Sequence, residues 1–376
     1  MLSPLAFRDL VSGRRQGVAA AVLRGGLRLA EVFYAGAVRW RNRRYQSGAA
    51  AVHRMNVPVV SVGNLTLGGT GKTPMVEWLA RWFRARGVRV AIVSRGYGAA
   101  AGTQNDEALE LARKLPDVPH VQNADRAAAA RKLIAEFQSQ VILLDDGFQH
   151  RRIGRDLDIV LLDALEPFGF GHVFPRGTLR EPIDGLRRAD VVALSRADML
   201  DAGQREDIWQ TVLRYAPQAI RAEVVHAPRM LLAASGLLKK GTGSEPTSEN
   251  HAKNDGSEVP VPLFQPLERI RPLAVAAFCG LGNPAGFRHT LETCGCRLAA
   301  FREFPDHHRY TRADVQSLAA WAKGLDVSAV LCTEKDLVKL SVDQLGGRPL
   351  WALGVGLEFL AGQQAVEAEL AKFVGR

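Results

Sequence analysis

The sequence predicts an α/β protein, with a doubly wound parallel sheet, a second smaller α/β domain and an N-terminal amphipathic helix. Three observations predict this fold. Short apolar runs alternate with helical patterns from Val57 onward, a glycine-rich segment joins the first run to a helix, and 376 residues exceed the usual size of one domain. Hydrophobic residues make up 47% and charged residues 23% of the chain, which is typical of globular proteins rather than disordered ones.

The first 56 residues carry most of the positive charge. Ten arginines stand there against Asp9 and Glu31, a net charge of +8 within a chain total of +10. Across Val18–Trp40, charged residues recur at helical spacing and leave a broad apolar face. That face contains Val22, Leu23, Leu27, Leu29, Phe33, Tyr34 and Val38. The basic and aromatic residues 39–45 suit anionic lipid headgroups as well as nucleic acid.

We therefore interpret residues 1–56 as a membrane-associating helix and basic segment. Two alternatives stay open at this point. The helix could pack on its own domain with a solvated charged side, and the arginine excess could reflect a GC-rich genome, since only ten of the 49 basic residues are lysine. No signal peptide and no run of 18 apolar residues is present, so we expect neither export nor a membrane span.

The elements of the first α/β domain follow in order. A buried strand is predicted at Val57–Val62, a loop at Gly63–Thr73, a helix at Pro74–Arg86 and the next strand at Val88–Ser94. Further strands are predicted at Val141–Leu144, Asp158–Leu162 and Val191–Ser195. Strands that alternate with helices form a parallel sheet, whose ligands bind at the carboxyl ends of the strands.

A polar segment separates this pattern from a second one. Residues 239–262 are rich in Gly, Ser, Glu, Asn and Pro and predict a flexible insertion. Beyond it, strands are predicted at Leu273–Phe278 and Ala329–Thr333, and a helix near Gln364–Phe373. The predicted regions are 1–56 for the membrane-associating part, 57–238 for the nucleotide-binding domain, 239–262 for the linker and 263–376 for the C-terminal domain. The four cysteines show neither zinc-ligand spacing nor a disulfide framework.

The glycine-rich segment has the pattern of a phosphate-binding loop, because Gly-Lys-Thr follows a strand and opens a helix. Glycines let backbone amides curl around phosphate oxygens, and the helix N-terminus adds its dipole. We expect Lys72 to bridge the β and γ phosphates of ATP and the Thr73 hydroxyl to bind Mg²⁺. The predicted nucleotide-binding residues are Gly68, Gly69, Thr70, Gly71, Lys72 and Thr73. Thr66 stands where the pattern has glycine.

Carboxylates for metal binding and for catalysis are found in two further segments. An apolar run from Val141 ends in Asp145 and Asp146, as in the strand that orients Mg²⁺ in P-loop proteins. Asp106 and Glu107 open a predicted helix, where they are candidates for a base that deprotonates an acceptor hydroxyl. On pattern alone they are equally well explained as acids favoured by the helix dipole. The sequence thus predicts a P-loop NTPase-like first domain.

Taken together, these residues resemble the tetraacyldisaccharide 4'-kinases, which phosphorylate the 4' position of a lipid A precursor. The resemblance covers most of the chain and rests on an ordered set of segments: Ser61–Asn64, Gly68–Pro74, Ser94–Gly98, Asp106–Glu107, Asp145–His150, Leu179–Pro182, Phe304–His308 and Thr333–Asp336. Asn105 and Ala108 depart from the usual Gly and Pro of the family, and the insertion at 239–262 is unlike its compact members.

The resemblance implies two α/β domains joined by a hinge, with MgATP bound between them at the cytoplasmic face of the bacterial inner membrane. The acceptor would be an acylated disaccharide 1-phosphate, and no nucleic-acid partner is expected. Asp106 would act as the base with help from His307, although the neighbouring His308 is an alternative. The remaining residues that the resemblance places at the substrate are Glu107, Arg126, Gln149, His150 and Arg180.

Other function classes remain to be compared with this one. A P-loop also fits a membrane-docked ATPase or switch protein, which would hydrolyse ATP slowly without an acceptor. A nucleic-acid-binding protein rests only on the arginine cluster, with no recognition fold in support. Thr333–Asp336 resembles the base-reading motif of GTPases, but Glu334 breaks it, so guanine specificity is not expected.

Overall fold

The computed structural model describes residues 4–96, 106–233, 264–306, 308–340 and 342–375. The α-helices are α1 (Pro4–Val11), α2 (Val18–Gln46), α3 (Lys72–Arg84), α4 (Asp106–Lys114), α5 (Arg126–Phe137), α6 (Ala202–Tyr215), α8 (Pro284–Thr293), α9 (Arg312–Lys323), α10 (Glu334–Leu337) and α11 (Gln363–Ala371). The strands are β1 (Val59–Asn64), β2 (Val90–Ser94), β3 (His120–Gln122), β4 (Val141–Asp145), β5 (Leu157–Asp163), β6 (Val191–Ser195), β7 (Ile220–Ala233), β8 (Phe264–Gln265), β9 (Ala274–Cys279), β10 (Arg297–Glu303), β11 (Ala329–Thr333), β12 (Gln344–Leu345) and β13 (Arg348–Ala361).

The chain forms two compact units. Unit 1 contains Met1–His226 and Leu357–Arg376, and unit 2 contains Ala227–Gly356. Strands β7 and β13 are each divided between the two units. The domain boundaries expected from sequence stay a prediction, and the insertion at 239–262 lies outside the described residues.

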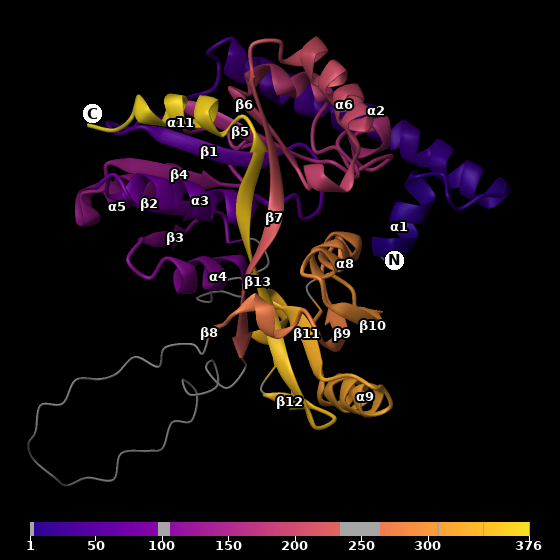
Figure 1. Ribbon diagram of the computed structural model, residues 1–376. Coiled ribbons are helices and arrows are strands. Elements are labelled where there is room, and N and C mark those ends of the chain that lie inside the picture. The colour runs from indigo at the N-terminus through magenta and orange to yellow at the C-terminus, as the bar shows by residue number, and fades with distance from the viewer. Residues whose placement is uncertain (1–3, 97–105, 234–263, 307, 341, 376) are drawn as a thin grey trace, which may run out of the picture. The chain divides into compact units, whose positions relative to one another are not determined.

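Unit 1 is built on a parallel sheet of order β3-β2-β4-β1-β5-β6-β7 (Figure 1). Helices cover both of its faces, which confirms the predicted doubly wound arrangement. On one face Val60 and Val62 of β1 pack against α3, α4 and α11. On the other face Val59 packs against α5, while Val192 and Leu194 of β6 pack against α6. Strand β1 lies at the centre, so the segment that follows it is placed over the middle of the sheet.

Unit 2 has a smaller parallel sheet of order β10-β9-β11-β13. Helix α8 packs on one face of it and α9 on the other. The Asp336 carboxylate is fully buried and accepts hydrogen bonds from the Gly280 amide, the Tyr310 hydroxyl and the Thr333 hydroxyl. The segment Thr333–Asp336 is therefore a structural brace inside unit 2.

The N-terminal helix is longer than the sequence pattern predicts and continues unbroken through Gly25 and Gly26 to Gln46. Only one residue of the predicted apolar face, Val38, is buried, and it is buried together with Ala20 and Ala35. Most of the large apolar residues point away from the protein. No helix in the described ranges combines the length and the apolarity needed to span a membrane.

Candidate active site

The glycine-rich segment joins the carboxyl end of β1 to α3. Gly71 caps this helix with a φ of 85°, so the helix begins at Lys72, two residues before the predicted start. A Cβ at Gly71 would lie 2.4 Å from Nε2 of His226, which leaves room only for glycine. At Gly68 (φ 116°) and Gly69 a Cβ would meet no atom within 4 Å. Gly68 and Gly69 are exposed, so the backbone at these two positions is accessible to a phosphate.

Thr66, which stands where such loops usually have glycine, lies in a paired backbone segment. It forms an antiparallel bridge with Leu179, and the amide of Arg180 donates to the carbonyl of Leu65 at 2.7 Å. Paired, extended backbone accepts β-branched residues readily. Threonine at this position is thus compatible with the loop.

Three cationic side chains surround Asp146, the residue that follows β4. Lys72 Nζ lies 3.6 Å from its Oδ1, and Nη1 of Arg180 lies 2.8 Å from each of its carboxylate oxygens. Arg126 donates to its backbone carbonyl at 2.7 Å. Burial opposes ionisation of Asp146, but Lys72 and Arg180 outweigh this effect and lower its pKa to about 2. The carboxylate is therefore ionised at neutral pH, within an excess of positive charge.

Asp145, the last residue of β4, has the opposite electrostatic character. Its side chain is buried, and its Oδ1 has no hydrogen-bond partner within the described part of the chain. Burial and then the charge of Glu107 raise the pKa of Asp145 to about 7, against the opposing effect of Lys72. A buried carboxylate oxygen without a partner is suited to a bound cation.

These carboxylates fit Mg²⁺ better than a metal held entirely by protein. Among the described residues no group of three or more His, Cys, Asp or Glu side chains could hold a metal ion. Mg²⁺ is commonly bound by one or two carboxylates together with phosphate oxygens and water. Asp145, Asp146 and the buried Thr73 at the start of α3 supply such a partial set.

Two residues that sequence reasoning missed hold the phosphate-binding loop in place. Arg196, just after β6, donates from Nη2 to the Gly69 carbonyl at 2.7 Å. Its Nη1 lies 2.7 Å from Oδ2 of Asp163 at the end of β5. Arg196 is buried and adopts a left-handed φ of 57°. The signal that could have identified both residues is their place at the carboxyl ends of predicted strands.

Glu181 is a third residue without a predicted role. It is fully buried, and its carboxylate accepts from Gln149 (3.0 Å), Asn42 (3.0 Å) and Arg188 (2.8 Å). These partners come from the segment after β4, from α2 and from a short helical turn at 183–188. Glu181 thus links the N-terminal helix to the loop that carries Asp146.

The predicted substrate residues Gln149 and His150 lie next to this cluster. Gln149 also donates to the Asn64 carbonyl at 2.9 Å, so its amide is used to fix the loop. Burial, with the charges of Arg126 and Arg152, lowers the pKa of His150 to about 4. Burial alone lowers the pKa of His120 to about 4; its Nε2 lies 2.9 Å from Oγ of Ser94. Both imidazoles are therefore neutral at pH 7.

The predicted catalytic residues are only partly described. Asp106 begins α4, but its side chain lies outside the described part of the structure, as does His307. His308, the alternative to His307, lies 3.1 Å from Asp314 and packs against the rings of Phe304 and Tyr310. Their roles stay predictions. Unit 1 brings together Lys72, Thr73, Glu107, Arg126, Asp145, Asp146 and Arg180.

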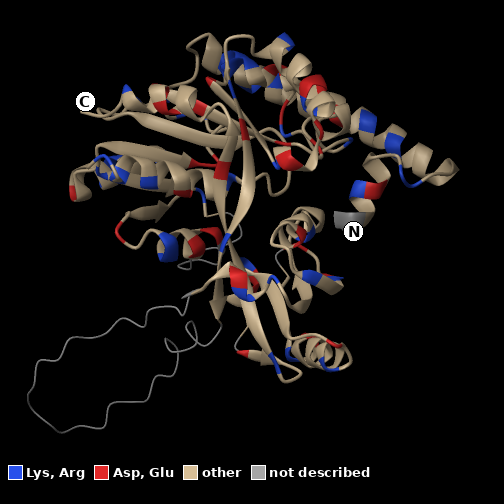
Figure 2. Ribbon diagram, viewed as in Figure 1, with Lys and Arg blue, Asp and Glu red and all other residues tan. Residues whose placement is uncertain are grey.

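Helix α2 presents an apolar stripe to solvent. Val22, Leu29 and Val32 are between 63% and 69% exposed, and Phe33 and Trp40 are 73% and 63% exposed. Figure 2 shows basic residues recurring along the same helix. Apolar side chains in such number on one helix are unusual on a monomer surface and indicate an interaction surface.

The inner side of α2 is fixed by polar contacts. Glu31 accepts from the Val173 amide at 2.7 Å and lies 3.0 Å from Nδ1 of His172. The Tyr34 hydroxyl donates to the Arg180 carbonyl at 3.1 Å. Arg180 in turn forms an ion pair with Asp146. Tyr34 of α2 is therefore connected through Arg180 to the carboxylate beside Lys72.

The comparisons with known proteins agree with one another. The tetraacyldisaccharide-1-P 4'-kinase family matches residues 23–375. A tetraacyldisaccharide 4'-kinase of Anaeromyxobacter dehalogenans (strain 2CP-C) is 38% identical over 375 residues, covering 95% of this chain and 92% of the relative. One from Geobacter sulfurreducens is 34% identical over 363 residues, covering 92% of each chain.

A solved structure shares the fold. LpxK from Aquifex aeolicus, in complex with ATP, is 26% identical with a TM-score of 0.67, and the match covers 94% of this chain and 99% of that one. All of these similarities are to kinases, so they give no support to a nucleotide-driven switch.

We predict that Arg196→Ala weakens ATP binding by about tenfold or more, because it removes a charge-assisted hydrogen bond from the loop, a contact of about 1.5–3 kcal/mol. The measurement is the Kd for ATP by calorimetry. Arg155→Ala is the matched control. Arg155 also forms a buried ion pair, with Asp158 at 3.0 Å, but among the described residues it makes no contact with the phosphate-binding loop. Equal losses in both variants would contradict a specific role for Arg196.

We also predict an acid-sensitive stability from His120 and His150. Their pKa of about 4 in the folded protein lies below the ordinary 6.5, so the unfolded chain binds protons that the folded chain does not. Their contribution is present above pH 6.5 and is lost as the pH falls toward 4. Urea unfolding across this range should show a shallower loss of stability in a His120→Asn/His150→Asn variant, whereas parallel curves would refute the prediction.

Proposed function

The chain belongs to the tetraacyldisaccharide-1-P 4'-kinase family, and on this premise we propose that the cluster around Asp146 carries out phosphoryl transfer from ATP to the 4'-hydroxyl of a tetraacyldisaccharide 1-phosphate. The observation that supports this most strongly is the meeting of Lys72, Arg126 and Arg180 at Asp146, beside a loop with open backbone. Excess positive charge at the N-terminus of α3 is suited to the phosphates of ATP.

The donor half of the site is formed by residues of unit 1. The loop amides at Gly68–Gly71 receive the phosphates, and Lys72 stabilises the charge that develops on the transferred group. Because Lys72 already lies beside Asp146, its ammonium is positioned before the nucleotide binds. Arg196 keeps the Gly69 carbonyl turned away from the phosphates, which prevents repulsion between the two.

The residues also fit the metal that this family requires. Asp145 and Asp146 would hold it, together with the hydroxyl of Thr73. When bound, Mg²⁺ supplies charge neutralisation on the phosphate oxygens. The partnerless Oδ1 of Asp145 and the ionised carboxylate of Asp146 are the two groups that support this assignment.

The acceptor half is proposed from the sequence. Asp106 would take the proton of the sugar hydroxyl, and His307 would assist. Asp106 begins α4, and the next residue, Glu107, lies near enough to Asp145 to raise the pKa of that carboxyl. The start of α4 is therefore close to the residues proposed to hold the metal.

We further propose that α2 docks the enzyme on the cytoplasmic face of the inner membrane. Its exposed stripe would enter the interfacial region while the nearby arginines meet anionic headgroups. A lipid acceptor lies in the membrane, so docking brings the enzyme to it. Through Tyr34 and Arg180, the docked helix would also support the catalytic cluster.

The reaction is tested with detergent-dispersed tetraacyldisaccharide 1-phosphate and MgATP, with mass spectrometry of the lipid product. The wild type should add one phosphoryl group to the lipid. Lys72→Ala should lower kcat by about 10²- to 10³-fold, and Asp106→Ala by about 10²- to 10⁴-fold. The exposed Lys132→Ala on α5 is the control and should retain full activity. Folded wild-type protein that yields no bisphosphorylated lipid would refute the function.

Membrane docking is tested by Leu29→Ser/Phe33→Ser. Each side chain contributes about 1.5–3 kcal/mol when it leaves water, so binding to anionic vesicles should fall by at least tenfold while the Kd for ATP is unchanged. Phe137→Ser/Leu360→Ser removes two exposed apolar residues elsewhere in unit 1 and serves as the control. Sedimentation with vesicles measures both variants, and equal binding by both would exclude the stripe as the docking surface.

A further inference from the structure

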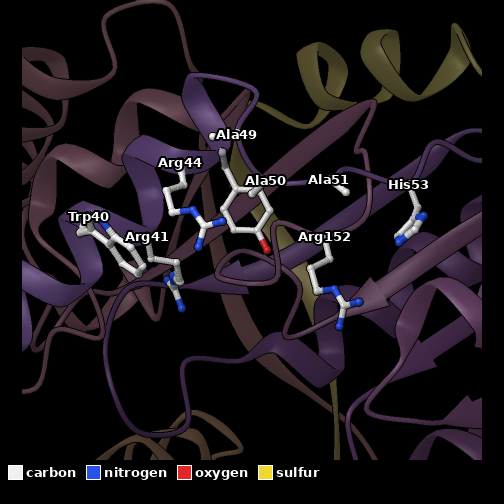
Figure 3. A pocket seen from close by; sticks show the side chains of 9 residues that line it. Trp40, Arg41, Arg44, Ala49, Ala50, Ala51, His53 and Arg152 are labelled. Carbon is white, nitrogen blue, oxygen red and sulfur yellow. The ribbon is translucent and has the colours of Figure 1, made fainter.

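A basic pocket lies at the carboxyl-terminal end of α2 in unit 1 (Figure 3). Its volume is about 360 Å³. Three alanines at 49–51 form part of its wall. The side chains that give it chemical character are Trp40, Arg41, Arg44, Tyr45, His53 and Arg152. The proposed reaction uses none of these residues.

The lining of the pocket does not include the residues proposed for phosphoryl transfer, although the charge of Arg152, after burial and Arg126, helps to lower the pKa of His150. Arg152 belongs to the loop that runs from the carboxyl end of β4 to the amino end of β5. The His53 amide donates to the Arg152 carbonyl at 2.8 Å, and the Gly154 amide donates to the His53 carbonyl at 2.8 Å. Because His53 lies in the segment that leads to the amino end of β1, these hydrogen bonds hold the backbone of Arg152 toward the amino ends of β1 and β5.

The guanidinium groups in the pocket are exposed and make no direct ion pair. Arg41, Arg44 and Arg152 form no ion pair with a described carboxylate, although the charge of Arg152, after the backbone amide of Ala128, helps to lower the pKa of the Asp125 carboxyl. Figure 3 shows the three side chains around the pocket, with Arg152 apart from Arg41 and Arg44 in this view. Gathered like charges repel one another, so an anion that binds between them gains interactions with all three.

The chemistry of the pocket selects among anions. Guanidinium groups match the oxygens of phosphate, to which they donate in pairs. The Arg44 guanidinium lies 5.1 Å from the ring centroid of Trp40, which orients it without neutralising its charge. Trp40 is also the last residue of the exposed stripe of α2. A molecule with acyl chains along the stripe would therefore place a phosphate near the pocket.

We propose that this pocket binds the phosphate of an anionic phospholipid headgroup and so fixes α2 at one point of the membrane. The proposal rests on the membrane docking proposed above, but it does not depend on the kinase reaction. The phosphate of the acceptor lipid has the same chemistry. The bilayer phospholipid is favoured because the pocket continues the exposed stripe and because its lining includes neither Lys72 nor Asp146.

The test uses the full chain without ATP or acceptor, titrated with dihexanoyl-phosphatidylglycerol below its critical micelle concentration. Calorimetry should show saturable binding of one lipid per chain. Arg44→Gln/Arg152→Gln should weaken this binding by at least tenfold. Arg28→Gln/Arg39→Gln removes the same charge from α2 outside the pocket and should weaken it by less than about twofold. Ala50→Phe, which fills the pocket without removing a charge, should weaken it as strongly as the first variant.

Three results would overturn the proposal. Equal losses in the two arginine variants would show that net charge alone attracts the lipid. Unchanged binding by Ala50→Phe would place the lipid elsewhere. Glucosamine 1-phosphate carries the sugar phosphate of the acceptor. If it bound the pocket more tightly than dihexanoyl-phosphatidylglycerol and displaced it, the pocket would belong to the acceptor. Because no measurement involves phosphoryl transfer, failure here is distinguishable from failure of the proposed reaction.

Discussion

The carboxylate of Asp146 is the charge on which the site depends. Lys72 comes from α3, Arg126 from α5 and Arg180 from the segment that pairs with Thr66, and all three converge on this one residue. Without the carboxylate the cations would repel one another and the elements that carry them. Asp146 adopts a left-handed φ of 54°, so the turn after β4 is strained in order to present it. The carboxylate thus holds Lys72 and Arg180, and the backbone carbonyl of the same residue holds Arg126, so three cations are placed for the negative charges of a nucleotide.

The same cluster is joined to the N-terminal helix. Tyr34 contacts the Arg180 carbonyl, and Asn42 contacts Glu181, the next residue along the chain. Glu181 in turn binds Gln149, three residues after Asp146. Any displacement of α2 therefore acts directly on the two residues that position the loop and its carboxylate. This arrangement connects the helix to the site in addition to the membrane docking proposed for it.

The central residues of the candidate site could be predicted from the sequence. Lys72, Asp145 and Asp146 could be found because their chemistry requires particular residue types directly beside predicted strands. The contacts of Arg196 and Glu181 could not be predicted, because they are tertiary contacts, although Arg196 follows a predicted strand and Glu181 lies in one of the segments that carry the family resemblance. Two uses of the apolar face of α2 stayed open in the sequence for a related reason. The hydropathy pattern shows that a helix has an apolar side, but it cannot show whether that side packs on the protein or lies at its surface.

In α2, the residues that fix the helix on the protein differ from the residues that form its exposed apolar stripe. Glu31, Asn42 and small side chains such as Ala35 set how the helix is rotated on the protein. The large apolar residues on its other side take no part in that choice. Exchange of one large apolar type for another on that side should therefore leave the rotation of the helix and the position of Arg180 unaltered.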